Sequence, residues 1–195
     1  MDSVVSRWFG AEFRRLHPLL QALHLHGGVL AGPIEIALGR GLARPFGRAI
    51  ARKLGIPLQP GPHTLRVEIG HRPDCLLWNR RFDERQDMDS TFHPVGAWPD
   101  GLWLERTGPV RLGLGVEVVQ GGWYWRCRKA WVFGVRLPLA LFPQSTAYKR
   151  IEEGRYRFQV TFTMPLLGEV LSYGGLLESR SARAVESSQP FAGKI

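Results

Sequence analysis

The chain has 195 residues, of which 44% are hydrophobic, and includes ten Phe and seven Trp. This length and composition suit one domain with a substantial core and exclude a disordered protein. The formal net charge is +9, but only four of the 26 basic residues are lysines. That bias toward arginine fits a GC-rich coding genome, so the charge by itself does not indicate a nucleic-acid partner.

Nothing in the sequence predicts a membrane span or a secretory leader. The longest apolar stretches are interrupted by Gly134, Arg136 and Pro138, well short of the roughly 20 residues that cross a bilayer. The N-terminus lacks the basic segment and apolar run of a signal peptide. We therefore expect a cytoplasmic protein without a transmembrane segment.

The N-terminal part is predicted to be helical. Apolar residues recur every three or four positions in the first 23 residues, and Pro18 interrupts the pattern. Because proline is tolerated in the first turn of a helix but not in its interior, one short helix should end near Leu16 and a second should begin at Pro18. The two glycines that follow should stop the second helix, and residues 29–38 read as a first strand.

A further helix is predicted over residues 42–54. It carries an apolar stripe and a basic stripe. The basic stripe is most simply a solvated face, and contact with a membrane surface is the alternative. The apolar stripe consists of Leu42, Phe46, Ala49, Ile50 and Leu54, and the basic stripe of Arg44, Arg48, Arg52 and Lys53.

From residue 64 onward the hydrophobic period is two, which is typical of strands. Short turns between these strands favour antiparallel neighbours, and a sheet of nine strands that closes on itself removes its exposed edges. We therefore predict a mainly β fold of the α+β class, an antiparallel meander forming a calycin-like barrel or half-barrel with two N-terminal helical segments. The later strands are expected at residues 64–71, 75–82, 102–106, 111–119, 123–133, 146–152, 155–164 and 169–178.

One domain should account for residues 1–178. The tail at residues 179–195 is rich in Ser, Ala and Gly, and we expect it to be disordered.

Arg80 is the first candidate for a functional residue. Strand alternation places it between Trp78 and Phe82 on one face. If that face is concave, the guanidinium is held in an apolar wall and needs a partner to offset its desolvation. The partner is a protein carboxylate, with Glu105 and Glu152 as candidates, or a ligand carboxylate or phosphate, which arginine recognises with two hydrogen bonds.

An aromatic stripe is the second candidate. Trp123, Trp125, Trp131 and Phe133 have the same parity and should share one face of a strand. Aromatic side chains of this kind can stack nucleic-acid bases. The arginines between them have the opposite parity, however, so stacking and phosphate contacts would lie on opposite faces. This arrangement favours a core or pocket lining over nucleic-acid binding.

Several kinds of catalytic or metal site have no support in the sequence. Gly39 and Gly41 precede a helix, but the third glycine of a dinucleotide-binding loop is missing. Cys75 and Cys127 have no CxxC pattern and no histidine at metal-site spacing, so we expect reduced cysteines and no metal. No serine lies in a nucleophile elbow, and no cofactor is indicated.

Short motifs run through the chain, including Arg40-Gly41-Leu42-Ala43, Gly55-Ile56-Pro57, Trp78-x-Arg80-x-Phe82, Leu104-Glu105-Arg106-x-Gly108-Pro109, Gly154-Arg155-Tyr156-Arg157-Phe158 and Tyr173-x-Gly175. Over about residues 8–178 this series resembles the bacterial domain of unknown function 4166. The resemblance implies a domain that occurs alone or attached to oxidoreductases of the saccharopine-dehydrogenase or short-chain type, as an accessory and not as the redox domain. Where a typical member has Tyr-Arg-Gly in the last strand, this chain has Tyr173-Gly174-Gly175. The activity of that family is uncharacterised.

The sequence favours a small-molecule binding module over two alternatives. One alternative is a cofactor-independent enzyme, such as an isomerase or hydrolase, that uses Glu105 or Glu152 as an acid or base. The other is an interaction domain that docks on an oxidoreductase through its basic helix. In the binding module, Arg80 would orient an anionic or polar head in an apolar cavity. The cavity would be lined by Trp78, Phe82, Trp123, Trp125 and Tyr173.

Overall fold

The computed structural model describes residues 2–139 and 143–180 of the chain. The tail predicted at residues 179–195 therefore falls, apart from its first two residues, outside the described residues.

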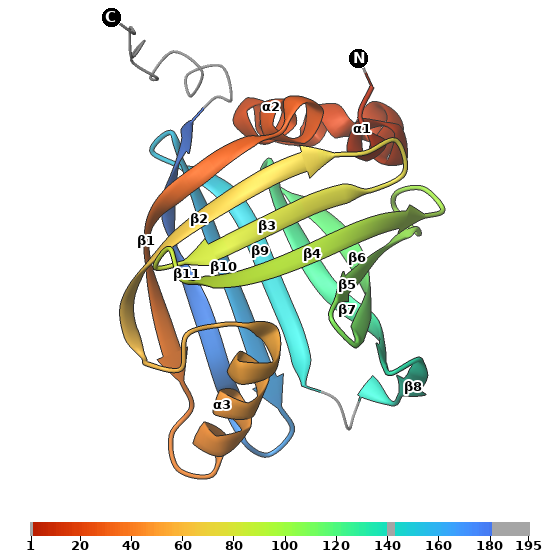
Figure 1. Ribbon diagram of the computed structural model, residues 1–195. Helices are drawn as coiled ribbons and strands as arrows, with labels where there is room; N and C mark the ends of the chain where they lie inside the picture. The colour runs from red at the N-terminus through yellow and green to blue at the C-terminus, as the bar shows by residue number, and fades with distance from the viewer. Residues whose placement is uncertain (1, 140–142, 181–195) are drawn as a thin grey trace, which may run out of the picture.

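The described strands form one antiparallel sheet that closes into a barrel (Figure 1). Strands β1 to β7 pair in chain order, β7 pairs with β9, and β9, β10 and β11 continue the ring until β11 pairs with β1. The short β8 is an additional strand on the end of β7. The predicted mainly β fold, with its closed meander, is confirmed. The strands are Gly28–Leu38 (β1), Gly61–His71 (β2), Leu76–Phe82 (β3), Gln86–Val95 (β4), Leu102–Thr107 (β5), Val110–Val119 (β6), Gly122–Val132 (β7), Val135–Leu137 (β8), Gln144–Glu152 (β9), Arg155–Met164 (β10) and Gly168–Arg180 (β11).

Helices lie at both ends of the barrel (Figure 1). One end is covered by α1 (Val4–Phe9), the 3-10 helix η1 (Gly10–Arg15) and α2 (Pro18–His26). The break before Pro18 is as predicted, because the proline occupies the first turn of α2. At the opposite end lies α3 (Ala43–Leu54). None of the described helices is long and apolar enough to cross a membrane.

Aromatic side chains fill the barrel under the N-terminal helices. The ring of Trp8 packs against that of Trp103 with centroids 5.4 Å apart, and Phe9 packs against Trp123 at 4.9 Å, both edge to face. Such pairs contribute beyond the apolar area that they bury. This end of the barrel is therefore a packed core.

Strand β4 was not predicted, and its sequence shows why. It reads QDMDSTFHPV, which is polar and contains a proline, so it lacks the apolar alternation of the other strands. Only Met88, Ser90 and Phe92 are buried along it, and one of these three is a serine. With serine in place of an apolar residue at the middle buried position, the sequence does not show the period of two that is typical of a strand.

The aromatic stripe predicted on one face of β7 is wrong beyond Trp125. Pairing of β6 with β7 shifts register between Gly113 and Leu114, which is a β-bulge. Because an extra residue on one strand reverses the faces beyond it, Trp131 lies on the outer face, where the guanidinium of Arg111 stacks 4.6 Å from its ring centroid. Phe133 lies in the turn after β7 and is 79% exposed.

The packing of α3 also differs from the simplest expectation for an apolar stripe. The residues of α3 that are buried are the small ones, Ala43, Gly47 and Ala51. Leu42 and Phe46 of the predicted stripe are instead 77% and 46% exposed. Gly47 lies against the backbone carbonyl of Val170 on β11 so closely that a side chain would overlap it. Small residues therefore allow the helix to approach the barrel closely.

We expect Gly47→Ala to lower the free energy of unfolding by about 1–3 kcal/mol, the usual cost of overpacking. The loss should appear even though alanine is favoured over glycine within a helix by roughly 1 kcal/mol. Urea unfolding of this variant and of Arg44→Ala, on the exposed side of the same helix, measures the effect. Equal or greater stability of Gly47→Ala would contradict the close contact with β11.

Candidate functional site

A pocket of about 200 Å³ lies inside the barrel. Its wall is mostly aliphatic and aromatic, and comes from inward-facing positions of nearly every strand. Ile50, Lys53 and Leu54 of α3 also line it. The pocket therefore extends to the α3 end of the barrel and not to the end filled by aromatic side chains.

Five of the eight side chains predicted to form the site line this pocket: Trp78, Arg80, Glu105, Trp125 and Tyr173. Strand alternation explains the grouping, since each faces inward on β3, β5, β7 or β11. The other three, Phe82, Trp123 and Glu152, are not part of the wall.

Each of these three lies elsewhere for a simple reason. Phe82 is fully buried and packs edge to face on Tyr173, with ring centroids 5.9 Å apart. Trp123 lies nearer the end of the barrel that the N-terminal helices cover, where it packs against Phe9 of α1. Glu152 has the outward parity of β9 and accepts a hydrogen bond of 2.6 Å from Arg150. The prediction of Glu152 as a partner for Arg80 is therefore wrong.

Arg80 lies in a polar cluster that joins three neighbouring strands. Its Nη1 donates to Oγ of Ser90 on β4 at 3.1 Å, and this hydroxyl is 2.7 Å from Oγ1 of Thr107 on β5. The carboxylate of Glu105 lies 3.8 Å from Nη2 of Arg80. Charge-assisted hydrogen bonds are about 2.7–2.9 Å long, so the guanidinium is not tightly paired with Glu105. Because strand β4 was not predicted, strand alternation in the sequence could not identify Ser90 as a partner of Arg80.

Two further polar groups of the pocket wall have unmet hydrogen-bonding capacity. The indole nitrogen of Trp78 and the hydroxyl of Tyr156 are buried and have no hydrogen-bond partner within residues 2–139 and 143–180. Burial raises the pKa of both Tyr156 and Tyr173, so both remain neutral phenols. Buried donors of this kind normally find a partner.

A buried amine and imidazole form a second polar group that sequence reasoning missed. Nζ of Lys149 lies 2.7 Å from Nε2 of His24, and both side chains are almost completely buried. Three indoles surround the amine, with ring centroids of Trp123, Trp78 and Trp125 at 3.7, 4.6 and 5.5 Å. Lys149 is thus enclosed beyond the pocket wall that Trp78 and Trp125 form.

The charge state of this pair follows from its surroundings. Burial lowers the pKa of Lys149 well below its ordinary value, and the nearby charge of Arg80 lowers it further. Burial, followed by the proximity of Lys149, likewise lowers the pKa of His24. Each desolvated aromatic ring favours the ammonium form by about 2 kcal/mol, so the three indoles offset part of the several kcal/mol that burial of an unpaired charge costs. The direction of both pKa shifts favours the neutral amine and the neutral imidazole.

A signal for the pair was present in the sequence. Lys149 has the inward parity of Ala147 on a correctly predicted strand. His24 falls on the apolar face of α2 together with Leu20 and Leu23. A lysine at an inward position of a closed barrel is buried, although lysine is usually exposed to solvent.

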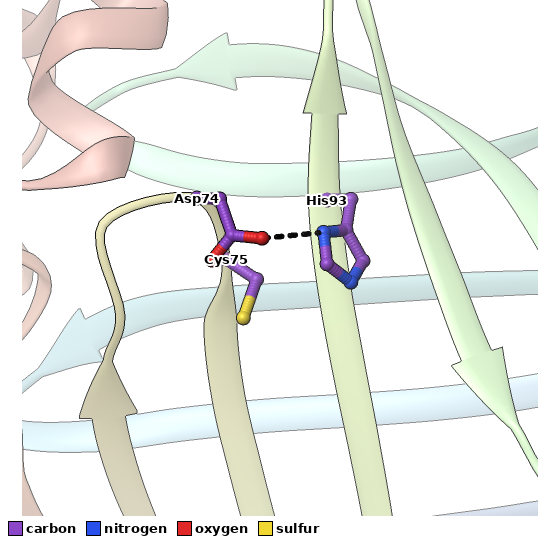
Figure 2. A group of neighbouring side chains, drawn as sticks. All are labelled: Asp74, Cys75 and His93. Atoms are coloured by element: carbon purple, nitrogen blue, oxygen red, sulfur yellow. Dashed lines mark ion pairs between the residues drawn. The ribbon is translucent and has the colours of Figure 1, made fainter.

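The adjacent residues Asp74 and Cys75 meet His93, which lies on the next strand (Figure 2). The β3–β4 register that pairs Leu76 with Phe92 brings them together. Their ligand atoms lie within 4.8 Å of one another, whereas donors around a tetrahedral zinc are about 3.5 Å apart. Burial and the adjacent Asp74 also raise the pKa of the Cys75 thiol. The arrangement is an exposed His–Asp pair beside a protonated thiol.

The neutral state of Lys149 predicts how stability depends on pH. The unfolded chain keeps the lysine protonated up to about pH 10.4, so it binds more protons than the folded protein at neutral pH. Stability should therefore rise with pH, by up to about 1.4 kcal/mol per unit for one proton. We expect Lys149→Met to reduce this slope between pH 7 and about pH 8, below the range in which cysteines titrate. The free energy of unfolding in urea is the quantity to measure.

Lys53→Met, which removes an exposed lysine, is the matched control and should keep the wild-type slope. The same slope in Lys149→Met and wild type would mean that Lys149 is charged in the folded protein.

A family model described as "Domain of unknown function (DUF4166)" matches residues 16–177. No curated protein matches the chain.

Proposed function

The chain belongs to the family of domain of unknown function 4166, and we propose that its barrel binds a small apolar molecule whose carboxylate or other polar head lies against Arg80. The observation that carries this proposal is an arginine only 7% exposed in the wall of an apolar pocket, with its nearest carboxylate 3.8 Å away.

The hydrogen-bonding state of Arg80 supports a ligand role. A guanidinium has five N–H donors, and within the described parts of the chain Arg80 makes one hydrogen bond, to Ser90. The hydroxyl of Tyr156 and the indole N–H of Trp78 line the same pocket without partners in the described chain. A carboxylate or hydroxyl head would accept hydrogen bonds from such donors. The rest of the wall would contact its apolar body.

The pocket volume limits the ligand. An engineered apolar cavity of about 150 Å³ binds benzene, whereas drug-sized ligands occupy roughly 300–1,000 Å³. The pocket here, at about 200 Å³, suits a compact molecule somewhat larger than benzene or one short alkyl chain. Because the pocket extends to α3, the apolar end of a ligand with a longer alkyl chain would point toward that helix.

Binding of straight-chain carboxylates of increasing length tests the proposal, and it can be followed by tryptophan emission because Trp78 and Trp125 line the pocket. We expect saturable binding that strengthens with chain length until the pocket is full. Primary alcohols of equal length distinguish an anionic head from a neutral polar one. No saturable binding of either series would contradict a small-molecule function.

Arg80→Met should weaken binding of the carboxylate by about 1–3 kcal/mol, or roughly 5- to 150-fold in Kd. The fold should tolerate the change, because removing an incompletely paired buried charge relieves its desolvation. Arg81→Met is the matched control, since Arg81 lies on the outer face and pairs with Asp87. It should bind like wild type.

A double-mutant cycle separates a ligand-binding arginine from a structural one. Urea midpoints of Arg80→Met, Glu105→Gln and the double variant give the coupling between the two side chains. Strong destabilisation by Arg80→Met, with coupling to Glu105 above about 2 kcal/mol, would identify a structural ion pair and overturn the ligand role.

A further inference from the structure

We infer that the α3 end of the barrel is a docking surface for an anionic lipid bilayer. The inference rests on which side chains this end exposes, and it does not depend on what the pocket binds.

Exposed apolar side chains are concentrated at this end. Seven large hydrophobic residues are exposed in the described chain. Two of them, Val95 and Val119, lie near the N-terminal helices, since the segments that follow them bond to Trp8 and His17. The other five come from α3 and the residue before it, from the β7–β8 turn with the start of β8, and from the β10–β11 turn, and we call them the apolar rim. The apolar rim consists of Leu42, Phe46, Phe133, Val135 and Leu166.

Helix packing explains why the rim residues of α3 are exposed. The helix contacts β11 through small residues, among them Gly47. Leu42 and Phe46 lie one turn apart on a different face, which the barrel does not cover. Large apolar side chains that a domain leaves uncovered as a group indicate a contact surface.

A direct contact links two of the three segments. Nζ of Lys53 on α3 lies 5.3 Å from the ring centroid of Phe133 in the β7–β8 turn. The β10–β11 turn leads into β11, against which α3 packs, and Figure 1 shows that turn beside the helix. The segments that carry the apolar rim therefore lie together at the α3 end of the barrel.

Charge identifies the partner. Between residues 40 and 54 the chain has five basic side chains and no acidic one. None of the five forms a salt bridge with any described residue of the chain. A helix that combines exposed apolar residues with a basic face is the type that lies in a bilayer interface, where anionic lipids attract each basic residue. The five are Arg40, Arg44, Arg48, Arg52 and Lys53.

Co-sedimentation with lipid vesicles tests this inference on the full chain. We expect binding to vesicles of phosphatidylcholine and phosphatidylglycerol, little binding to phosphatidylcholine alone, and weakening by salt. Arg44→Gln combined with Arg48→Gln should reduce the partition coefficient roughly fivefold for each arginine removed. Leu42→Ser combined with Phe133→Ser should reduce the partition coefficient at low and at high salt.

Matched controls carry the same substitutions at the opposite end. Arg14→Gln with Arg72→Gln, and Val95→Ser with Val119→Ser, should bind vesicles like wild type. Far-UV circular dichroism checks that each variant keeps the β-rich fold. Arg80→Met should also bind vesicles normally, so loss of the pocket ligand and loss of docking are measured separately.

Three results would overturn the inference. The first is no binding to anionic vesicles. The second is binding that falls equally in the control variants, which would reflect net charge alone. The third is a dimer, seen by sedimentation velocity, that the Leu42→Ser and Phe133→Ser changes dissociate, because the apolar rim would then contact a second copy of the chain.

Discussion

Closure of the sheet is the constraint on which the rest of this structure depends. Once β11 pairs with β1, every second residue of a ring strand faces the interior wherever the pairing is regular. In those stretches a residue at an inward position is buried even when its side chain is polar. Arg80, Glu105 and Lys149 are inside for this reason. Their burial is imposed by the backbone, and the chemistry of the interior follows from it.

The interior meets this constraint in two different ways. Burial among indoles lowers the pKa of Lys149, which favours its neutral form, and its amine is hydrogen-bonded to His24. Arg80 cannot give up its charge, because a guanidinium remains protonated in proteins. It instead donates a hydrogen bond to the hydroxyl of Ser90 and lies 3.8 Å from the carboxylate of Glu105. The first arrangement lies beyond the pocket wall and leaves Nδ1 of His24 without a partner among the described residues, whereas the second leaves N–H donors of Arg80 facing the pocket.

The sequence predicted the barrel because most strands alternate clearly and the turns between them are short. It also placed Arg80 and its aromatic neighbours on one face, and named Glu105 as one of two candidate carboxylate partners. It failed where the backbone departs from strict alternation or where a polar residue occupies an inward position. Strand β4 was hidden by Ser90. Glu152 was assigned to the interior because the predicted bounds of a strand do not tell whether its odd-numbered or its even-numbered residues face inward.

The bulge opposite Gly113 decides how much space the barrel encloses. If the same residues of β7 paired in strict alternation, with no bulge, Lys129 and Trp131 would continue the inward row begun by Trp123 and Trp125, and their side chains would occupy the α3 half of the interior. With the bulge, Ala130 and Val132 face inward instead. The bulge therefore exchanges two of the longest side chains on β7 for two of the shortest. The hollow part of this barrel is in that sense a product of register, and the same sequence paired without the bulge would fill it.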